Sequence, residues 1–261
     1  MNVLCCQLDI VWEDKTANHL KVEALLEQSA PPEDTLVILP EMFATGFSMN
    51  VNAITDSSSR ETESFLSQTA ARHKVFVLGG TVNSDAAGRG RNECVVFSPQ
   101  GTEVARYCKL HPFTFGGEAQ HYAAGSGVQI FRVGEFTGAT FICYDLRFPE
   151  IFRAAVRRGA NLFTVIANWP STRIDHWTTL LKARAIENQA YVVGVNRCGD
   201  DPHLSYPGRS VIFDPRGRVV VEADAREGAM GADLDLQALT DYRRELPFLK
   251  DMRQDYVPEE R

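Results

Sequence analysis

The segment VVFSPQGTEV at residues 95–104 is matched later in the chain by VIFDPRGRVV at residues 211–220. Each segment has two β-branched runs around a Pro-x-Gly sequence, which predicts a β-hairpin that turns at the proline and glycine. Two hairpins with similar letters indicate that one structural unit occurs twice in the chain. The alternative is a coincidence between two common hairpin patterns.

The elements that precede the two hairpins follow the same order, because short apolar strands alternate with amphipathic helices in each half. In the first half we expect strands at 3–9, 35–40, 75–82, 92–98 and 103–108, and helices at 16–28 and 60–72. An irregular segment at 110–127 and a strand at 128–133 follow. In the second half we expect strands at 138–143, 162–167, 191–197, 210–214 and 218–223, and helices at 149–158 and 175–189. Each half is therefore a β-α-β-α-β-β-β unit.

The near-continuous apolar character of the strands requires that both faces of each sheet are buried. Two mixed sheets stacked face to face, with helices outside, meet this requirement. We therefore predict an α/β fold, a four-layer α-β-β-α sandwich whose two copies are related by a pseudo-two-fold axis. Because no Pro/Ser-rich linker separates the halves, we expect one domain over residues 1–261. A helix after residue 236 and an extended tail at about 245–261 would end it, packed against a neighbouring subunit.

The charge and the amino-terminal sequence bear on possible partners and on location. The chain has 34 acidic and 27 basic residues, a net charge of −7, and no basic stripe, which disfavours binding to nucleic acid. The start, MNVLCCQLDIVWEDK, reads as a buried strand rather than a signal peptide. No run approaches the roughly 18 apolar residues of a membrane-spanning helix. We expect a cytoplasmic protein that does not bind membranes.

The six cysteines lie mostly inside apolar runs, which is typical of reduced core cysteines in a cytosolic chain. The sequence also has no C-x-x-C, no H-E-x-x-H and no other compact spacing of zinc ligands. We expect neither a disulfide framework nor a metal.

Three chemically capable side chains stand at the ends of predicted strands. Glu41 follows TLVILP, Lys109 ends EVARYC and Cys143 ends GATFIC. Sites in α/β proteins form outside the carboxyl ends of strands, where these groups would be partly desolvated and would tune one another's pKa. Each residue taken alone also has a structural interpretation: a core cysteine, a carboxylate at a helix start and a solvated lysine.

Together the three groups suggest attack on an amide. Glu41 would take the proton of the Cys143 thiol, which then becomes the nucleophile. Lys109 and the backbone N–H of Tyr144 would stabilise the oxyanion, and the glutamate would return the proton to departing ammonia. Spacing alone does not decide between this chemistry and the structural alternatives.

The sequence around these residues resembles the nitrilase superfamily of carbon–nitrogen hydrolases. The resemblance rests on LPEMF at 39–43, YCKLHPF at 107–113 and CYDLRFPE at 143–150. It implies a Glu-Lys-Cys triad of Glu41, Lys109 and Cys143, a cysteine thioester intermediate, an α-β-β-α sandwich, association as a homodimer or higher homo-oligomer, and no metal or organic cofactor. Glu118, in GGEAQHYAAG, occupies the place of a second family glutamate that positions the lysine or substrate; the less favoured alternative is a solvated loop carboxylate.

Further segments are similar to the omega-amidase branch of this superfamily, namely PEMFATGFSM at 40–49, ANWP at 167–170 and DHWTTLLKARAIENQAYV at 175–192. This similarity implies hydrolysis of 2-oxoglutaramate and 2-oxosuccinamate to 2-oxoglutarate or oxaloacetate plus ammonia. Alternatives are an amidase of deaminated glutathione or an N-carbamoyl compound, a nitrilase, and a non-catalytic relative that binds or assembles through the sandwich.

Candidate pocket residues follow from their position near these motifs. Phe43, Phe115 and Trp169 would form the wall of a compact apolar pocket. A substrate carboxylate would need a cation at the far end of the pocket, and Arg147 is a candidate. The alternative, which the sequence favours, is that Arg147 forms a salt bridge with Asp145 or Glu150.

Overall fold

The computed structural model describes residues 1–56 and 58–253, and within them the strands form two six-stranded mixed sheets and one two-stranded ribbon. The first sheet contains β1 (Asn2–Gln7), β2 (Leu36–Ile38), β3 (Phe76–Ser84), β4 (Gly90–Phe97), β5 (Glu103–Cys108) and β14 (Gly228–Asp233). The second contains β6 (Ile130–Val133), β7 (Phe136–Ile142), β8 (Leu162–Ala167), β9 (Tyr191–Asn196), β12 (Val211–Phe213) and β13 (Val219–Glu222). The ribbon pairs β10 (Cys198–Asp200) with β11 (Ser205–Pro207).

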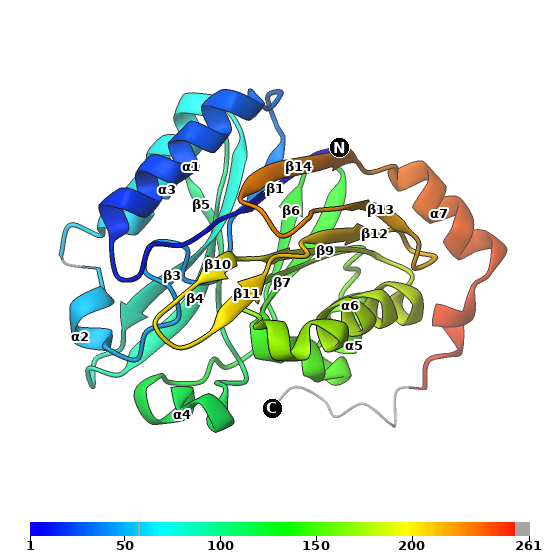
Figure 1. Cartoon of the computed structure of the whole chain (residues 1–261). Helices are drawn as coiled ribbons and strands as arrows, with labels where there is room; N and C mark the ends of the chain where they lie inside the picture. Colours follow the sequence, from blue (N-terminus) through cyan, green and yellow to red (C-terminus); the bar gives the residue numbers. More distant parts are fainter. Residues whose placement is uncertain (57, 254–261) are drawn as a thin grey trace.

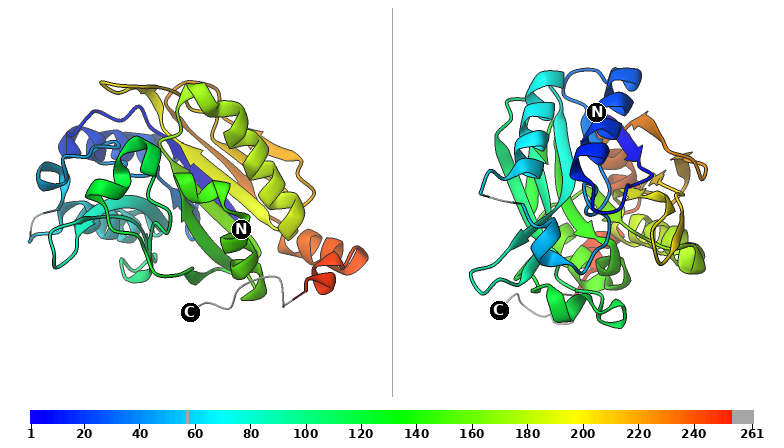
Figure 2. Two further views of the ribbon diagram at one scale, coloured as in Figure 1. Left: turned by 90° about the horizontal axis from the view of Figure 1, so that it is seen from below. Right: turned by 60° about the vertical axis from the view of Figure 1, so that its left-hand side comes forward.

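Helices cover the outer face of each sheet, so the four-layer α-β-β-α prediction is confirmed (Figures 1 and 2). The first sheet is covered by α1 (Lys15–Ser29) and α3 (Glu61–His73), and the second by α5 (Pro149–Arg157) and α6 (Ile174–Asn188). The remaining elements are the short helices α2 (Val51–Ile54), η1 (Thr114–Gly116), α4 (Glu118–His121), η2 (Cys143–Arg147) and η3 (Ser171–Arg173), and the C-terminal α7 (Leu236–Glu245) and η4 (Phe248–Asp251). No helix in the described ranges is long and apolar enough to cross a membrane.

The internal duplication is visible in the order of the strands. The runs β1-β2-β3-β4-β5 and β7-β8-β9-β12-β13 each begin with parallel pairs and end with antiparallel ones. The two hairpins agree in detail, since the register shifts at Phe97 in one and at Phe213 in the other. The turn glycines, Gly101 and Gly217, have φ of 73° and 75°. Each donates its N–H to the carbonyl three residues earlier, at 2.8 and 2.9 Å.

The core lies between the sheets, and strand β2 shows why its sequence is apolar throughout. Successive side chains in a strand point to opposite faces. Leu36 and Ile38 therefore pack between the two sheets, whereas Val37 packs among residues of the outer helices. The sheets also meet directly, since the Thr140 hydroxyl donates to Cys94 Sγ at 3.3 Å. A strand buried on both faces favours apolar side chains, and any polar side chain within it needs a hydrogen-bond partner.

Strand β14 and the ribbon were not predicted from the sequence. The β14 segment, GAMGAD, has small residues instead of the β-branched ones that favour strands, and it is held by antiparallel pairing with β1. The predicted helix after residue 236 is α7. The predicted extended tail at about 245–261 is wrong where it can be checked, because the described part contains the 3-10 helix η4. Residues 254–261 of that tail lie outside the described residues.

We expect Gly101→Ala to destabilise the fold more than Gly88→Ala. Both glycines have positive φ, which costs an L-residue about 1–2 kcal/mol. A Cβ at residue 88 would meet nothing within 4 Å, whereas at residue 101 it would lie 2.9 Å from the Ser67 carbonyl oxygen. Urea unfolding measures both variants, and equal losses would contradict the steric argument.

Candidate active site

The fold brings Glu41, Lys109 and Cys143 together from three strand ends. Glu41 lies just beyond β2, Lys109 directly follows β5, and Cys143 directly follows β7 of the other sheet. Lys109 Nζ donates to Glu41 Oε1 at 2.9 Å, and both side chains are buried. The site is therefore formed where the two sheets meet.

Glu118, the first residue of α4, completes a buried ion cluster. Lys109 Nζ lies 2.8 Å from Glu118 Oε2 and 3.1 Å from Oε1. Glu118 Oε2 also accepts the backbone N–H of Phe113 at 2.6 Å. The Glu118 side chain is buried, so the solvated-loop interpretation of this residue is wrong. One ammonium thus stands between two carboxylates.

Two asparagines that the sequence analysis did not identify hold these carboxylates. Asn92 Nδ2 donates to Glu41 Oε1 at 2.7 Å and to Glu118 Oε1 at 2.8 Å. Asn168 donates its backbone N–H to Glu41 Oε2 at 2.9 Å, and its Nδ2 to the Glu41 carbonyl at 2.7 Å. The sequence contained features that could have identified both residues, because Asn92 is a polar residue in an apolar strand and Asn168 belongs to the ANWP segment.

Electrostatics favour a charged lysine beside an ionised Glu41. Burial alone would raise the pKa of Glu41, but Lys109 and the hydrogen bonds from Asn92 and Asn168 outweigh it and hold this pKa below its ordinary value. Burial and the charge of Glu41 raise the pKa of Glu118. Burial opposes the charge of Lys109, yet the two carboxylates hold its pKa well above the ordinary value. Lys109 is therefore a fixed positive charge.

Cys143 is a neutral thiol in this environment. Burial first, and the negative charge of Glu41 next, raise its pKa well above the ordinary value, although Lys109 opposes the shift. Its backbone φ is 48°, an uncommon value for a residue other than glycine, and its Sγ lies 3.9 Å from the Asn168 carbonyl oxygen. A half-buried thiol with a raised pKa needs a base to become a nucleophile, and Glu41 is the carboxylate in contact with it.

Cys143 borders a pocket with aromatic and cationic walls. Trp169 and Arg147, both predicted as pocket residues, lie in this wall beside Tyr144. The lining is completed by Phe47, Phe113, Asn168, Pro170, Arg173, Leu204 and Tyr206. The arrangement suits a small ligand with an anionic end.

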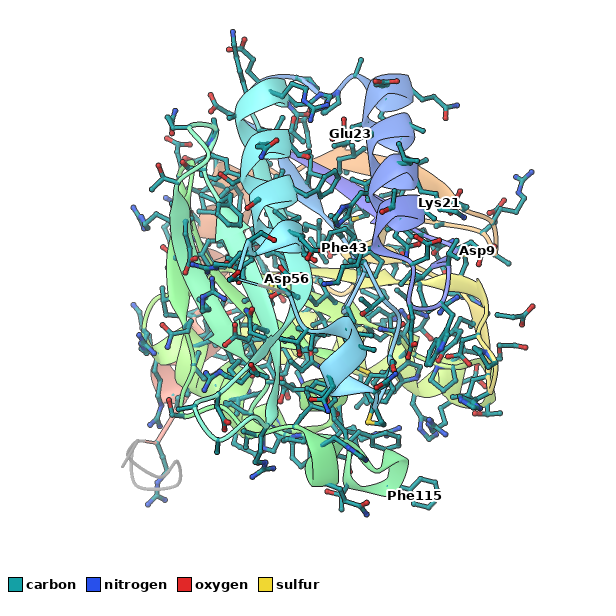
Figure 3. All side chains as sticks on the ribbon, turned by 90° about the vertical axis from the view of Figure 1, so that its left-hand side faces the viewer. Asp9, Lys21, Glu23, Phe43, Asp56 and Phe115 are labelled. Carbon is teal, nitrogen blue, oxygen red and sulfur yellow. The ribbon has the colours of Figure 1, made fainter. Side chains whose placement is uncertain are left out.

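The structure places the other two predicted pocket aromatics elsewhere. Phe43 is fully buried in the cluster between the first sheet and its helices, where it lies 6.1 Å from the ring of Phe65. Phe115, on η1, is 90% exposed and projects away from the molecule (Figure 3). The position of Phe43 two residues after Glu41 did not show that its side chain packs between the first sheet and its helices.

Arg147 does not form the salt bridge that the sequence favours. Among the described residues it has no ion pair with Asp145 or Glu150. Its guanidinium lies 4.9 Å from the Trp169 ring centroid, and two of its nitrogens are 3.3 Å from Nδ1 of His176. The side chain thus faces the pocket, as the alternative interpretation requires.

We find no metal-binding arrangement in the described part of the chain, where no group of three or more His, Cys, Asp or Glu side chains is placed to hold an ion. All six cysteines are free thiols.

Comparison with known proteins gives consistent matches. The carbon-nitrogen hydrolase family model matches residues 2–244. The 2-oxoglutaramate amidase of Bacillus subtilis (strain 168) is 36% identical over 97% of this chain and 98% of that protein. The omega-amidase YafV of Yersinia enterocolitica is 39% identical over 94% of each. Among solved structures, XC1258 of Xanthomonas campestris, a CN-hydrolase superfamily protein, has a TM-score of 0.92 at 34% identity and 99% coverage of both chains. Nit3 of Saccharomyces cerevisiae, a nitrilase superfamily member, has a TM-score of 0.85 at 25% identity, covering 98% of this chain and 96% of its own.

We expect Glu41→Gln to lower the pKa of Cys143 and yet abolish most amide hydrolysis. Removal of a negative neighbour makes the thiolate less unfavourable, so the midpoint of Cys143 alkylation should move to lower pH. Lys109 remains paired with Glu118 in this variant. Loss of a general base should reduce hydrolysis by roughly 10²–10⁴-fold.

The measurement is iodoacetamide alkylation of the Cys143 peptide as a function of pH, followed by mass spectrometry. Glu33→Gln, which alters an exposed partner of Lys74, is the control. A midpoint that stays in place or rises in Glu41→Gln would argue against the electrostatic assignment.

Proposed function

This chain belongs to the carbon–nitrogen hydrolase family and is a hydrolase that acts on amides, and from that premise we propose that it is an omega-amidase. Its substrates are terminal amides of 2-oxo acids, 2-oxoglutaramate and 2-oxosuccinamate, and its products are the 2-oxo dicarboxylates and ammonia. The names of the full-length relatives support this assignment. The observation that carries it is a pair of arginines, Arg147 and Arg173, in the pocket beside Cys143.

Among the residues that the structure describes, these two arginines line the pocket without a carboxylate to neutralise them. Other arginines of this chain are neutralised, as Arg106 is by Glu63, Glu93 and Glu103. Neither Arg147 nor Arg173 has an acidic partner within 4.0 Å among residues 1–56 and 58–253.

Aromatic faces hold the two guanidinium groups instead. Arg147 lies over Trp169, and Arg173 lies 5.6 Å from the centroid of Phe113. A guanidinium in a sheltered pocket is suited to bind a carboxylate through paired hydrogen bonds. A substrate with a carboxylate at one end and an amide at the other would span from these arginines to the thiol.

The first half of the reaction acylates Cys143. As Sγ attacks the amide carbonyl carbon, Glu41 accepts the thiol proton, and negative charge builds on the carbonyl oxygen. Lys109 and the N–H of Tyr144 stabilise this oxyanion. Collapse of the tetrahedral intermediate breaks the C–N bond, and Glu41 gives its proton to the leaving nitrogen. Ammonia departs and a thioester remains.

The second half releases the acid. Water loses a proton to Glu41 and attacks the thioester carbonyl, which forms a second oxyanion at the same donors. Collapse breaks the C–S bond, and Glu41 returns its proton to the sulfur. Glu118 positions Lys109 throughout, because it binds the same ammonium as Glu41. Each of these roles is assigned to a described side chain or to the Tyr144 backbone N–H.

Two further expectations from the sequence stay predictions. One is association through a two-fold interface, and the other is a cytoplasmic location.

We expect the wild type to release ammonia from 2-oxoglutaramate and Cys143→Ala to release none above background. The variant lacks the nucleophile but keeps the Glu41–Lys109 pair. Circular dichroism checks that both proteins are folded. A wild type inactive on 2-oxoglutaramate that hydrolyses another compound in a Cys143-dependent way would refute the substrate and keep the nucleophile, so deaminated glutathione, an N-carbamoyl amino acid and a nitrile belong in the same panel.

We expect Arg147→Met and Arg173→Met each to raise KM for 2-oxoglutaramate by about 10–100-fold, the effect of one lost charged hydrogen-bond donor. Hydrolysis of butyramide, which has no carboxylate, should change much less. Arg226→Met, at an 87% exposed side chain, is the matched control. Equal losses on both amides would show that the arginines support the fold rather than the carboxylate.

A further inference from the structure

The buried carboxylate of Asp145 accepts hydrogen bonds from four donors. Its Oδ1 accepts the His111 backbone N–H at 3.0 Å and lies 2.8 Å from His111 Nδ1. Its Oδ2 accepts the Tyr107 hydroxyl at 2.7 Å and the Ile142 backbone N–H at 3.1 Å. Asp145 itself is 0% exposed. A charged side chain so deeply buried is retained only where its bonds replace its lost hydration.

The four donors belong to two segments that carry the proposed chemistry. Ile142 immediately precedes Cys143, and Tyr107 and His111 lie on either side of Lys109. The connection is reinforced because the Tyr107 hydroxyl also accepts the Leu110 N–H at 3.3 Å. Asp145 is thus a direct link between the turn that holds the nucleophile and the segment that holds the lysine.

Both segments need such a link. The Cys143 turn has a positive φ, a conformation that persists only where its surroundings hold it. Oxyanion donors act only when they lie within hydrogen-bond distance of the developing charge, so small displacements reduce the rate. The ion pairs of Lys109 fix its ammonium relative to Glu41 and Glu118, but they do not fix the backbone of the Cys143 turn.

We propose that Asp145 is a positioning residue for the oxyanion site, which holds the Tyr144 N–H and the Lys109 ammonium at a fixed separation across the two segments. The proposal rests on the proposed function only in taking Cys143 as the nucleophile. Asp145 itself touches neither the substrate nor the reacting atoms.

Asparagine cannot replace this carboxylate, although it has the same shape. Oδ1 faces two donors of His111, whereas Oδ2 faces the Tyr107 hydroxyl and the Ile142 N–H, one donor from each segment. An asparagine presents one oxygen and one NH₂ group. With NH₂ in the Oδ2 position the Ile142 N–H loses its acceptor, and with NH₂ in the Oδ1 position the His111 N–H loses its acceptor. Asp145→Asn should therefore weaken the link between the segments without removing bulk from the core.

The test compares two reactions of the same thiol. Acylation by p-nitrophenyl acetate passes through a tetrahedral oxyanion, whereas alkylation by iodoacetamide displaces iodide and forms none. We expect Asp145→Asn to slow the p-nitrophenol burst by roughly 10²-fold, the effect of losing an oxyanion donor, and to change Cys143 alkylation by less than threefold. Because neither reagent is the proposed substrate, a wrong omega-amidase assignment leaves both readouts intact.

Three further variants make the comparison decisive. Tyr107→Phe removes one donor and leaves the carboxylate, so it should slow acylation by a few-fold and leave alkylation unchanged. This variant decides the question if Asp145→Asn does not fold. Asp214→Asn, which changes a carboxylate that accepts backbone N–H groups in a remote turn, should leave both rates unchanged. Cys143→Ala should abolish both signals. Parallel loss of acylation and alkylation, or wild-type acylation in Asp145→Asn or Tyr107→Phe, would refute the positioning role.

Discussion

The structure of the site depends on one buried ammonium held between two carboxylates. Lys109 lies within 3 Å of both Glu41 and Glu118, and all three side chains are shielded from water. Removing one partner of a buried ion pair costs about 3–5 kcal/mol, because the remaining charge is left uncompensated. Two carboxyl groups share one ammonium in this cluster, and the amide of Asn92 adds a donor to both glutamates.

In the proposed mechanism this cluster also makes Cys143 a latent nucleophile. The negative charge that would let Glu41 act as the base also raises the pKa of the Cys143 thiol. A protonated thiol is therefore favoured in the resting site, and the proposed attack is the step at which the proton leaves. A thiol with a raised pKa reacts slowly with general alkylating and oxidising reagents. The proposed nucleophile is therefore selective for a substrate that is already bound in the pocket.

Much of the fold was predictable because periodicity and turn chemistry report local structure directly. The hairpins at 95–104 and 211–220 revealed the duplication, and the strand ends at Glu41, Lys109 and Cys143 indicated where polar groups would gather. Strand β14 was not predictable in this way, since its small residues take their conformation from β1. The sequence also did not show in which direction individual side chains point. Phe43 and Phe115 stand close to site residues in the sequence, yet one points into the helix layer and the other into solvent.

The two halves of the duplicated fold no longer do equivalent work. Glu41, Lys109 and Asn92 belong to the first sheet and its ends, whereas Cys143 and Asn168 belong to the second. During synthesis the first half emerges with a base and a lysine but no nucleophile, and the second half adds a thiol that has no base until the sheets have docked. Under the proposed mechanism, activity therefore requires a fully assembled sandwich, so neither half alone nor a partly folded chain should hydrolyse an amide.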